Sequence, residues 1–287
     1  MIYETAIADA YAAAWEFAKP GKEPVNDWAG YKRHPSRSDV PGSSYTDDTM
    51  RTMINAMVML HGKAYDANAY IRVMKAVTGR DKRGGWSRNF RSFLDEQEGK
   101  SVEEWWEARK PRNTNGALMG AAVLGHLNTE FKAHKAGMTQ ALTTHDGEAA
   151  SYAGYLSSVA FLMRTNRTSP QTLARDLSRR FYVFRSEHML NHDFHDPVDM
   201  TARMTFEAIV AVLGRNMSLR SIVDDAIALG GDTDSVAAAC VGVASMCPHF
   251  YENDFPEWAY SDLERGNLVN QTILKRIDAE ISALISG

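Results

Sequence analysis

Two short stretches of this sequence concentrate carboxylates and hydroxyls. Asp232-Thr233-Asp234-Ser235 follows the pair Gly230-Gly231, and Thr46-Asp47-Asp48-Thr49 stands far upstream. Each stretch precedes an apolar segment with helical spacing, so each is expected at the start of a helix. One side-chain oxygen suffices to cap a helix, as Thr46 could do, whereas each stretch offers several. The surplus of oxygens indicates that capping alone does not explain these residues.

Metal binding would explain the surplus. If the two stretches face each other, four aspartates come together, and their charges repel unless some protonate or cations neutralise them. Those aspartates are Asp47, Asp48, Asp232 and Asp234. Oxygen ligands favour Mg²⁺, Mn²⁺ or Ca²⁺ over zinc or copper. We therefore predict one shared site for two divalent cations, while simple helix capping remains the alternative for either stretch alone.

Two further carboxylates lie near the N-terminus. Glu16 stands near the end of the first predicted helix, and Asp9 lies about two helical turns earlier on nearly the same face. Taken alone, Glu16 is an ordinary surface carboxylate and Asp9 is a helix-interior aspartate hydrogen bonded to a neighbouring element. Glu16 is retained as a candidate because it borders a long loop.

The composition describes a globular chain. It has 287 residues, is 44% hydrophobic, and carries 32 basic against 36 acidic side chains, for a net charge of −4. This balance argues against a dedicated nucleic-acid or membrane binder. The longest uncharged apolar stretch, 236–247, is too short to span a bilayer, and the N-terminus lacks the pattern of a signal peptide. With Cys240 and Cys247 expected as buried apolar residues, a cytoplasmic location is predicted.

Apolar residues recur at three- and four-residue spacing, and strand signals are almost absent. We therefore predict an all-α fold with one domain over residues 1–287. The long loops are expected at 19–44 and 79–87. Helices are predicted at 2–17, 48–61, 66–77, 89–96, 101–108, 115–126, 129–142, 145–164, 170–185, 199–213, 218–229, 232–246 and 261–285.

Several segments form an ordered series of motifs along the chain. They are Ala8–Phe17, Tyr45–Thr49, Thr114–Met119, Thr144-His145, Gly230–Ser235 and Pro256-Glu257-Trp258. In this order the chain resembles the ADP-ribosylglycohydrolases, the family that includes the dinitrogenase-reductase-activating glycohydrolase. The Gly-Gly-Asp-Thr-Asp-Ser stretch is the most specific of these motifs.

The resemblance implies a compact domain of orthogonally packed helices with a binuclear Mg²⁺ or Mn²⁺ centre. It assigns as metal ligands Thr46, Asp47, Asp48, Asp232, Asp234 and Ser235, with Glu16 as a nearby carboxylate that binds a metal or a water. It assigns to the ADP-ribose Asn115, Gly116 and His145, together with Gly84, Gly85 and Trp86 of a phosphate-side loop.

The implied activity is hydrolysis of the N- or O-glycosidic bond between ADP-ribose and a protein side chain or small acceptor. An arginine linkage is favoured, and an ADP-ribosylated nucleic acid stays open as a modified substrate. Glu16, Asp47 or Asp232 would activate water or protonate the leaving group. The chain is expected to act as a monomer, away from membranes.

Three functional alternatives stay open from sequence. The chain could bind ADP-ribose without turnover, hydrolyse phosphoesters with the same metals, or keep the metals for stability only. The sequence also departs from the family pattern, since Gly120 stands where the family has arginine, Ser235 where it has threonine, and alanines and Trp15 where the opening motif has glycines and a proline. The last change predicts a tighter cleft beside the first helix.

Two other features are weighed against ordinary explanations. His188, His192 and His195 cluster beside Pro197, but they lack helical spacing, so a solvated or substrate-facing loop is preferred over a transition-metal site. Arg80, Arg83 and Arg88, with Lys82 among them, could hold a phosphate or simply form a basic surface loop.

Overall fold

A computed structural model of the chain describes residues 1–19, 21–38, 41–181 and 197–286. Its elements, in chain order, are α1 (Ile2–Ala12), η1 (Ala13–Trp15), α2 (Asp47–Leu60), α3 (Ala67–Arg80), α4 (Arg88–Glu96), α5 (Val102–Ala108), η2 (Asn115–Ala117), η3 (Ala122–His126), α6 (Glu130–Ala141), α7 (Gly147–Arg164), η4 (Pro170–Thr172), α8 (Leu173–Arg180), α10 (Ala202–Arg215), α11 (Leu219–Leu229), α12 (Thr233–Ala244), α13 (Glu257–Asp262) and α14 (Leu268–Ser286). The described residues contain isolated β-bridges but no strand, and the all-α prediction is confirmed.

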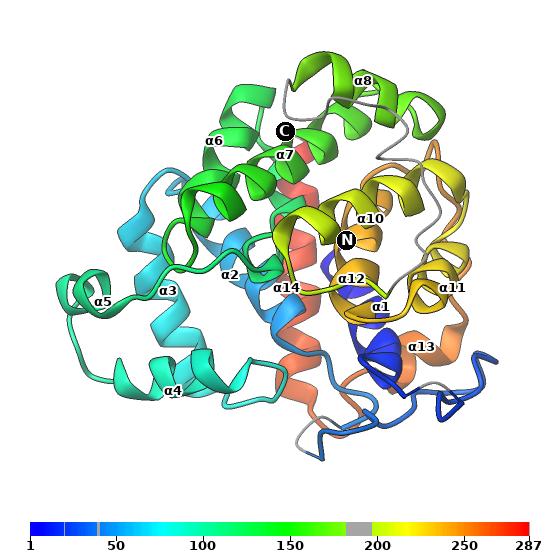
Figure 1. Cartoon of the computed structure of the whole chain (residues 1–287), viewed down its shortest axis with the longest axis horizontal. Helices are drawn as coiled ribbons and strands as arrows, with labels where there is room; N and C mark the ends of the chain where they lie inside the picture. Colours follow the sequence, from blue (N-terminus) through cyan, green and yellow to red (C-terminus); the bar gives the residue numbers. More distant parts are fainter. Residues whose placement is uncertain (20, 39–40, 182–196, 287) are drawn as a thin grey trace.

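Helix α12 lies at the centre of the helical assembly (Figure 1). All of its residues, Thr233–Ala244, are buried, and most are alanine, valine or glycine. A helix that is apolar on every side needs neighbours on every side, and α12 packs against α1, α2, α10 and α11. Helix α1 is equally alanine-rich, with Glu4 as its one residue that is not fully buried. Small side chains on both helices let their backbones approach closely.

Helix α2 separates two apolar clusters. One of its faces contributes Met53 and Ala56 to the main core, and another contributes Met50 and Ile54 to a second cluster with residues of α3, α4 and α5. The C-terminal helix α14 packs against both α1 and α2 (Figure 1). The first turns of α2 and α12 are therefore held inside the fold, where the two acidic stretches begin.

The C-terminal helix also fixes the start of α1. The Asp278 carboxylate accepts hydrogen bonds from the backbone N–H groups of Ile2 at 2.7 Å and Tyr3 at 2.9 Å. These groups have no partner within their own helix, so α14 supplies the cap that the sequence around Met1 lacks.

The predicted helix over 115–126 is wrong. Two short 3₁₀ segments, η2 and η3, flank Gly120, whose φ of +73° lies in the left-handed region. A Cβ atom at this position would stand 2.5 Å from the backbone nitrogen of Thr52. The chain turns here against α2, so glycine is required both for the backbone conformation and for the close approach.

The predicted helix over 261–285 is interrupted. Helix α13 ends at Asp262, and α14 starts only at Leu268. Between them, Glu264 has a φ of +54° and Gly266 a φ of +88°, which a continuous right-handed helix cannot accommodate.

The first predicted helix, 2–17, ends earlier than expected, at Ala12, and passes into the 3₁₀ turn η1. The predicted helix over 170–185 is described only as far as Phe181.

Among the described helices, none is long and apolar enough to cross a membrane.

Candidate active site

Helix α2 is anchored to α1 through the buried carboxylate of Asp9. The backbone N–H groups of Thr46 and Thr49 donate to Asp9 Oδ2 at 2.9 and 3.0 Å. Their hydroxyls donate to Asp9 Oδ1 at 2.8 Å and Oδ2 at 2.6 Å, respectively. Asp9 thus caps α2 from another helix. Thr46 occupies the N-cap position, but its own hydroxyl donates to Asp9 rather than accepting a cap hydrogen bond.

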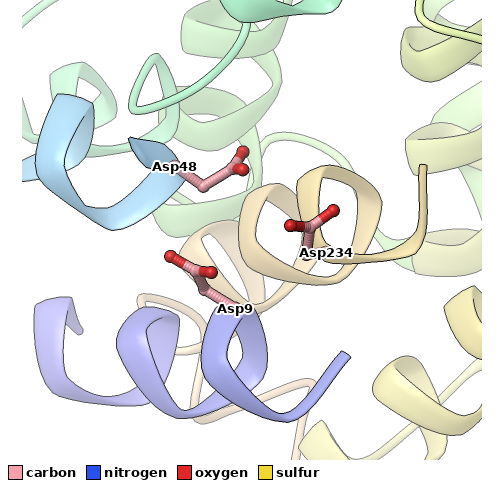
Figure 2. Close-up of side chains that lie close together, drawn as sticks. All are labelled: Asp9, Asp48 and Asp234. Atoms are coloured by element: carbon pink, nitrogen blue, oxygen red, sulfur yellow. The ribbon is translucent and has the colours of Figure 1, made fainter. Parts of the chain in front are cut away.

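The structure brings the acidic stretches together (Figure 2). Carboxylate oxygens of Asp9, Asp48 and Asp234 lie within 4.8 Å of one another, and the three side chains point toward a common centre from α1, α2 and α12. A second group with the same spacing contains Glu16, Asp232 and Asp234. Asp234 belongs to both groups, so the two potential cation positions are adjacent.

The turn before α12 depends on two glycines. Gly230 and Gly231 have φ values of +69° and +76°, and a Cβ on Gly231 would stand 2.0 Å from the carbonyl oxygen of Val198. Val198 pairs with this turn, accepting a hydrogen bond from the Asp232 N–H at 3.1 Å. The Phe17 N–H donates to the Gly231 oxygen at 2.8 Å, which places Glu16 next to the turn.

Hydrogen bonds from Asn115 and Ser235 orient the carboxylates. Asn115 Nδ2 donates to Asp232 Oδ2 at 3.0 Å. The Ser235 N–H donates to Asp234 Oδ1 at 3.0 Å, and the Ser235 hydroxyl donates to Asp48 Oδ2 at 3.3 Å. Ser235 therefore connects the second acidic stretch to the first.

Burial makes ionisation of these acids unfavourable. Burial, more than any other cause, raises the pKa of Asp47 to about 7 and the pKa of Asp232 to about 6. The pKa values of Asp48 and Asp234 rise well above their usual range, first through burial and then through neighbouring carboxylates. The basic side chain that opposes this effect is Arg51, which lowers the pKa of Asp47.

This donor set fits hard divalent cations. Carboxylates that are removed from water and crowded together favour either protonation or a bound cation. Within the described residues, none of the ion pairs involves Asp9, Asp48, Asp232 or Asp234. The available ligand atoms are carboxylate and hydroxyl oxygens, which suit Mg²⁺ and Mn²⁺.

The residues predicted to contact ADP-ribose come from two parts of the chain. In the first part, His145 Nδ1 is 2.8 Å from the Thr144 hydroxyl, and His145 Nε2 is 3.1 Å from the Thr114 hydroxyl. A Cβ on Gly116 would stand 3.0 Å from His145 Nε2. Burial lowers the pKa of His145 well below its usual value, and Arg51 lowers it further, so the ring is neutral at pH 7.

The second part is the loop that contains Gly84, Gly85 and Trp86. Gly84 lines a pocket of about 200 Å³ together with Tyr45 and Glu264. Trp86 is buried in the second apolar cluster, and the Arg51 guanidinium lies 5.4 Å from its ring centroid. The contacts of these three residues with a substrate remain predictions.

Arg83 of the same loop has a structural task. Its guanidinium donates to the Tyr45 carbonyl oxygen and to Glu264 Oε1, both at 2.9 Å, and also to Asp81. It lies 3.5 Å from the centroid of the Tyr45 ring. Arg83 thus holds Tyr45, the residue before Thr46. The guanidinium nitrogens that make these contacts are engaged within the protein.

His34 was missed by sequence reasoning. It comes from the long loop between η1 and α2, is buried, and contacts the Glu16 carboxylate through Nε2.

The predicted histidine cluster at His188, His192 and His195 lies outside the described residues. Trp15, the basis for predicting a tighter cleft, is buried beside Tyr11. Its Nε1–H donates to the Pro24 carbonyl oxygen, so the indole packs against the long loop that follows η1.

Gly85 is expected to be intolerant of any side chain. Its φ is +107°, and a Cβ would stand 2.4 Å from Asp47 Oδ1 and 2.7 Å from Thr46 Cβ. Gly85→Ala should therefore displace Asp47 and weaken Mn²⁺ binding at least about tenfold, the low end of the effect of disturbing residues that support metal ligands. Gly79→Ala is the matched control, because a Cβ there meets nothing within 4 Å. Equal Mn²⁺ affinity of both variants, measured by calorimetry, would contradict this prediction.

Comparison with known proteins shows to which family this chain belongs. A family model described as ADP-ribosylglycohydrolase matches residues 2–271. The chain belongs to the ADP-ribosylglycohydrolase family. A solved structure titled "ADP-ribosylglycohydrolase-related protein complex" has the same fold, with a TM-score of 0.72 and 18% sequence identity over 99% of this chain and 95% of that one. No curated protein sequence matches significantly.

The ADP-ribosylglycohydrolase assignment confirms the resemblance inferred from the motifs. Members of this family are hydrolases of ADP-ribose linkages, and the matched region includes every candidate residue named above. The structural relative supports the all-α fold of this ADP-ribosylglycohydrolase, although the two chains differ at most positions.

Proposed function

We propose that this ADP-ribosylglycohydrolase cleaves the N- or O-glycosidic bond between ADP-ribose and a protein side chain or small acceptor, releasing free ADP-ribose. An arginine linkage is the favoured substrate, and two Mg²⁺ or Mn²⁺ ions are the proposed cofactors. One observation carries the proposal: two groups of carboxylates that share Asp234 meet where α1, α2 and α12 converge.

The ligands would come from both acidic stretches. They are Thr46, Asp47, Asp48, Asp232, Asp234 and Ser235, of which Asp48, Asp232 and Asp234 belong to the two carboxylate groups, and Glu16 completes the second group. Bound there, two hard dications would supply Lewis acidity toward sugar hydroxyls and make a nearby water more acidic. Asp9 accepts four hydrogen bonds from Thr46 and Thr49, so its main task is to hold the first stretch in place.

The chain's own residues then have distinct tasks during cleavage. Glycosidic bonds break through a transition state with oxocarbenium character, and the fixed negative charges of Asp232 and Glu16 would stabilise it. Glu16, Asp47 or Asp232 would take a proton from the attacking water or give one to the leaving group. Asn115 orients Asp232 for this work through its amide hydrogen bond. Neutral His145 would exchange its hydroxyl partners for the ribose or phosphate of the substrate.

The proposal is tested with a panel of ADP-ribosyl conjugates. Arginine, serine, O-acyl and nucleic-acid conjugates are incubated with the protein and Mg²⁺ or Mn²⁺, with and without a chelator, and the products are separated by chromatography. We expect free ADP-ribose, released fastest from the arginine conjugate and only when metal is present. Asp232→Ala should lower this rate at least about a hundredfold, because it removes a candidate ligand and a candidate base.

Other products would point to the alternatives. Binding of ADP-ribose without release from any conjugate would identify a binding module. Release of inorganic phosphate from phosphate esters would identify a phosphoester hydrolase. Full activity of Asp232→Ala would contradict the proposed role of the second acidic stretch.

A further inference from the structure

His34 reaches the Glu16 carboxylate from the loop that precedes α2. The contact joins His34 Nε2 to Glu16 Oε2. The His34 side chain is 2% exposed, whereas the Glu16 side chain is 18% exposed. Glu16 therefore lies at the edge of the acidic cluster, where a carboxylate on a flexible side chain would have room to turn toward solvent. A buried donor that holds it limits this freedom.

The surroundings of His34 determine which ring nitrogen carries the proton. The backbone N–H groups of Ser36 and Arg37 both donate to His34 Nδ1 at 3.1 Å. A nitrogen that accepts these bonds has no hydrogen of its own, so the proton of the ring is on Nε2. His34 Nε2–H consequently donates to Glu16, and the imidazole acts as a fixed donor rather than as an acceptor.

The turn that contains His34 is itself tied to the other acidic stretch. Arg37 donates to the carbonyl oxygen of Gly85 at 2.5 Å and to that of Trp86 at 3.2 Å. Gly85 packs directly against Asp47. The segment 34–37 thus contacts two parts of the site. Arg37 binds the Gly85-Trp86 loop, which supports Asp47, and His34 binds the carboxylate of Glu16, which lies near Asp232 and Asp234.

We propose that His34 is a positioning residue that holds the Glu16 carboxylate beside Asp232 and Asp234. The backbone of Glu16 is fixed on one side by the hydrogen bond from Phe17 to Gly231, and His34 fixes its side chain from the other. Residues that orient the groups around a metal centre affect metal affinity or activity about 10- to 100-fold. The effect on turnover rests on the proposed function, whereas the effect on metal binding does not.

Two substitutions separate the donor and acceptor roles of His34. In His34→Gln the side-chain amide nitrogen takes the place of Nε2 and still donates to Glu16. In His34→Asn the side-chain oxygen takes the place of Nδ1 and still accepts from Ser36 and Arg37, but no donor reaches Glu16. We expect His34→Asn to lower kcat/KM and Mn²⁺ affinity about 10- to 100-fold, and His34→Gln to recover most of both. The reverse order would assign His34 to closing its own turn and would overturn the proposal.

A double-mutant cycle with Glu16→Gln provides the second measurement. Mn²⁺ affinity is measured by calorimetry without substrate, so the cycle does not depend on which conjugate is cleaved. If His34 acts through Glu16, His34→Asn should lower Mn²⁺ affinity less than about threefold once Glu16 is replaced. Additive losses would overturn the proposal. His61→Asn, at the exposed end of α2, serves as a control and should change nothing.

The two proposals can fail separately. If the unchanged protein releases ADP-ribose but the cycle is additive, the positioning role of His34 is wrong and the proposed function stands. If the cycle shows coupling but no conjugate is cleaved, His34 positions Glu16 at a metal centre whose reaction differs from the one proposed.

Discussion

Replacement of Asp234 by asparagine is expected to lower kcat/KM for the preferred conjugate at least about a thousandfold, which corresponds to roughly 4 kcal/mol of transition-state stabilisation. Asp234 is the one residue shared by both carboxylate groups. Its loss would therefore disturb both proposed cation positions, and a metal site supplies several kcal/mol to such a reaction. The same variant should lose the rise in melting temperature that we expect Mn²⁺ to produce in the wild-type protein.

The stability of the metal-free Asp234→Asn variant should not fall. Burial and the neighbouring carboxylates Glu16, Asp232 and Asp48 raise the pKa of Asp234 well above its usual range. Without a cation, burial and these neighbouring carboxylates favour the protonated, uncharged form of this carboxyl group, and asparagine has nearly the same shape and no charge. A loss of activity without a loss of stability would separate a ligand from a residue that merely supports the fold.

Asp176→Asn is the matched control for this experiment. The Asp176 carboxylate on α8 accepts hydrogen bonds from the hydroxyls of Thr168 at 2.7 Å and Thr172 at 2.8 Å. Its replacement should lower stability by about 1 kcal/mol through weaker hydrogen bonds, while activity and the response to Mn²⁺ persist. An Asp234→Asn variant that keeps more than about a tenth of the activity would contradict the assignment of Asp234 as a metal ligand.

The sequence predicted the two acidic stretches because their signal is local. Helix starts are marked by residue type and spacing, and the excess of oxygens at Asp47-Asp48 and Asp232–Ser235 needs no knowledge of distant contacts. Their meeting in space was a hypothesis, since it depends on how α1, α2 and α12 pack. Small residues along α1 and α12 permit that packing, but many alanine-rich helices share this property.

Asp9 and His34 show what the sequence did not reveal. Asp9 lies in the interior of α1, where a hydrogen bond to a neighbouring element was the preferred interpretation, and the structure confirms this through Thr46 and Thr49. That the element concerned is the first acidic stretch follows only from tertiary contacts. His34 stands in a loop without periodicity, and no local pattern relates a loop side chain to Glu16.

Gly120 illustrates a conflict between local pattern and tertiary packing. Apolar residues from Leu118 onward favour a helix, yet the backbone at Gly120 must pass within contact distance of α2 with a positive φ. The sequence pattern shows which residues are apolar, but it does not show that this segment packs against α2. The glycine was noted as a departure from the family's arginine, and the approach to Arg51 and Thr52 explains why no side chain fits there.

The metal-free protein is expected to become less stable as the pH rises from about 4 to about 7. The pKa of Asp47 is raised to about 7 and that of Asp232 to about 6, both mainly by burial, whereas an unfolded aspartate titrates near 3.9. Between these values the folded state binds more protons than the unfolded state, so raising the pH favours unfolding. The stabilisation is fully present below about pH 4 and is lost as the pH passes through 6 and 7. Its size is a few kcal/mol, since each pKa unit corresponds to about 1.4 kcal/mol.

Divalent cations should reverse this trend, because they bind the ionised carboxylates and release their protons. At a free Mn²⁺ concentration about a thousandfold above Kd, binding adds roughly 4 kcal/mol of stability, or roughly 5–10 °C in Tm for a chain of this size. The gain should be larger at pH 8 than at pH 5, where protons compete for the same oxygens. Melting curves at both pH values, with Mn²⁺ or with a chelator, test this directly, and Asp234→Asn should show little response to Mn²⁺. A chelated protein that is more stable at pH 8 than at pH 5 would mean that these carboxylates are ionised without a cation. The cluster would then have another source of positive charge.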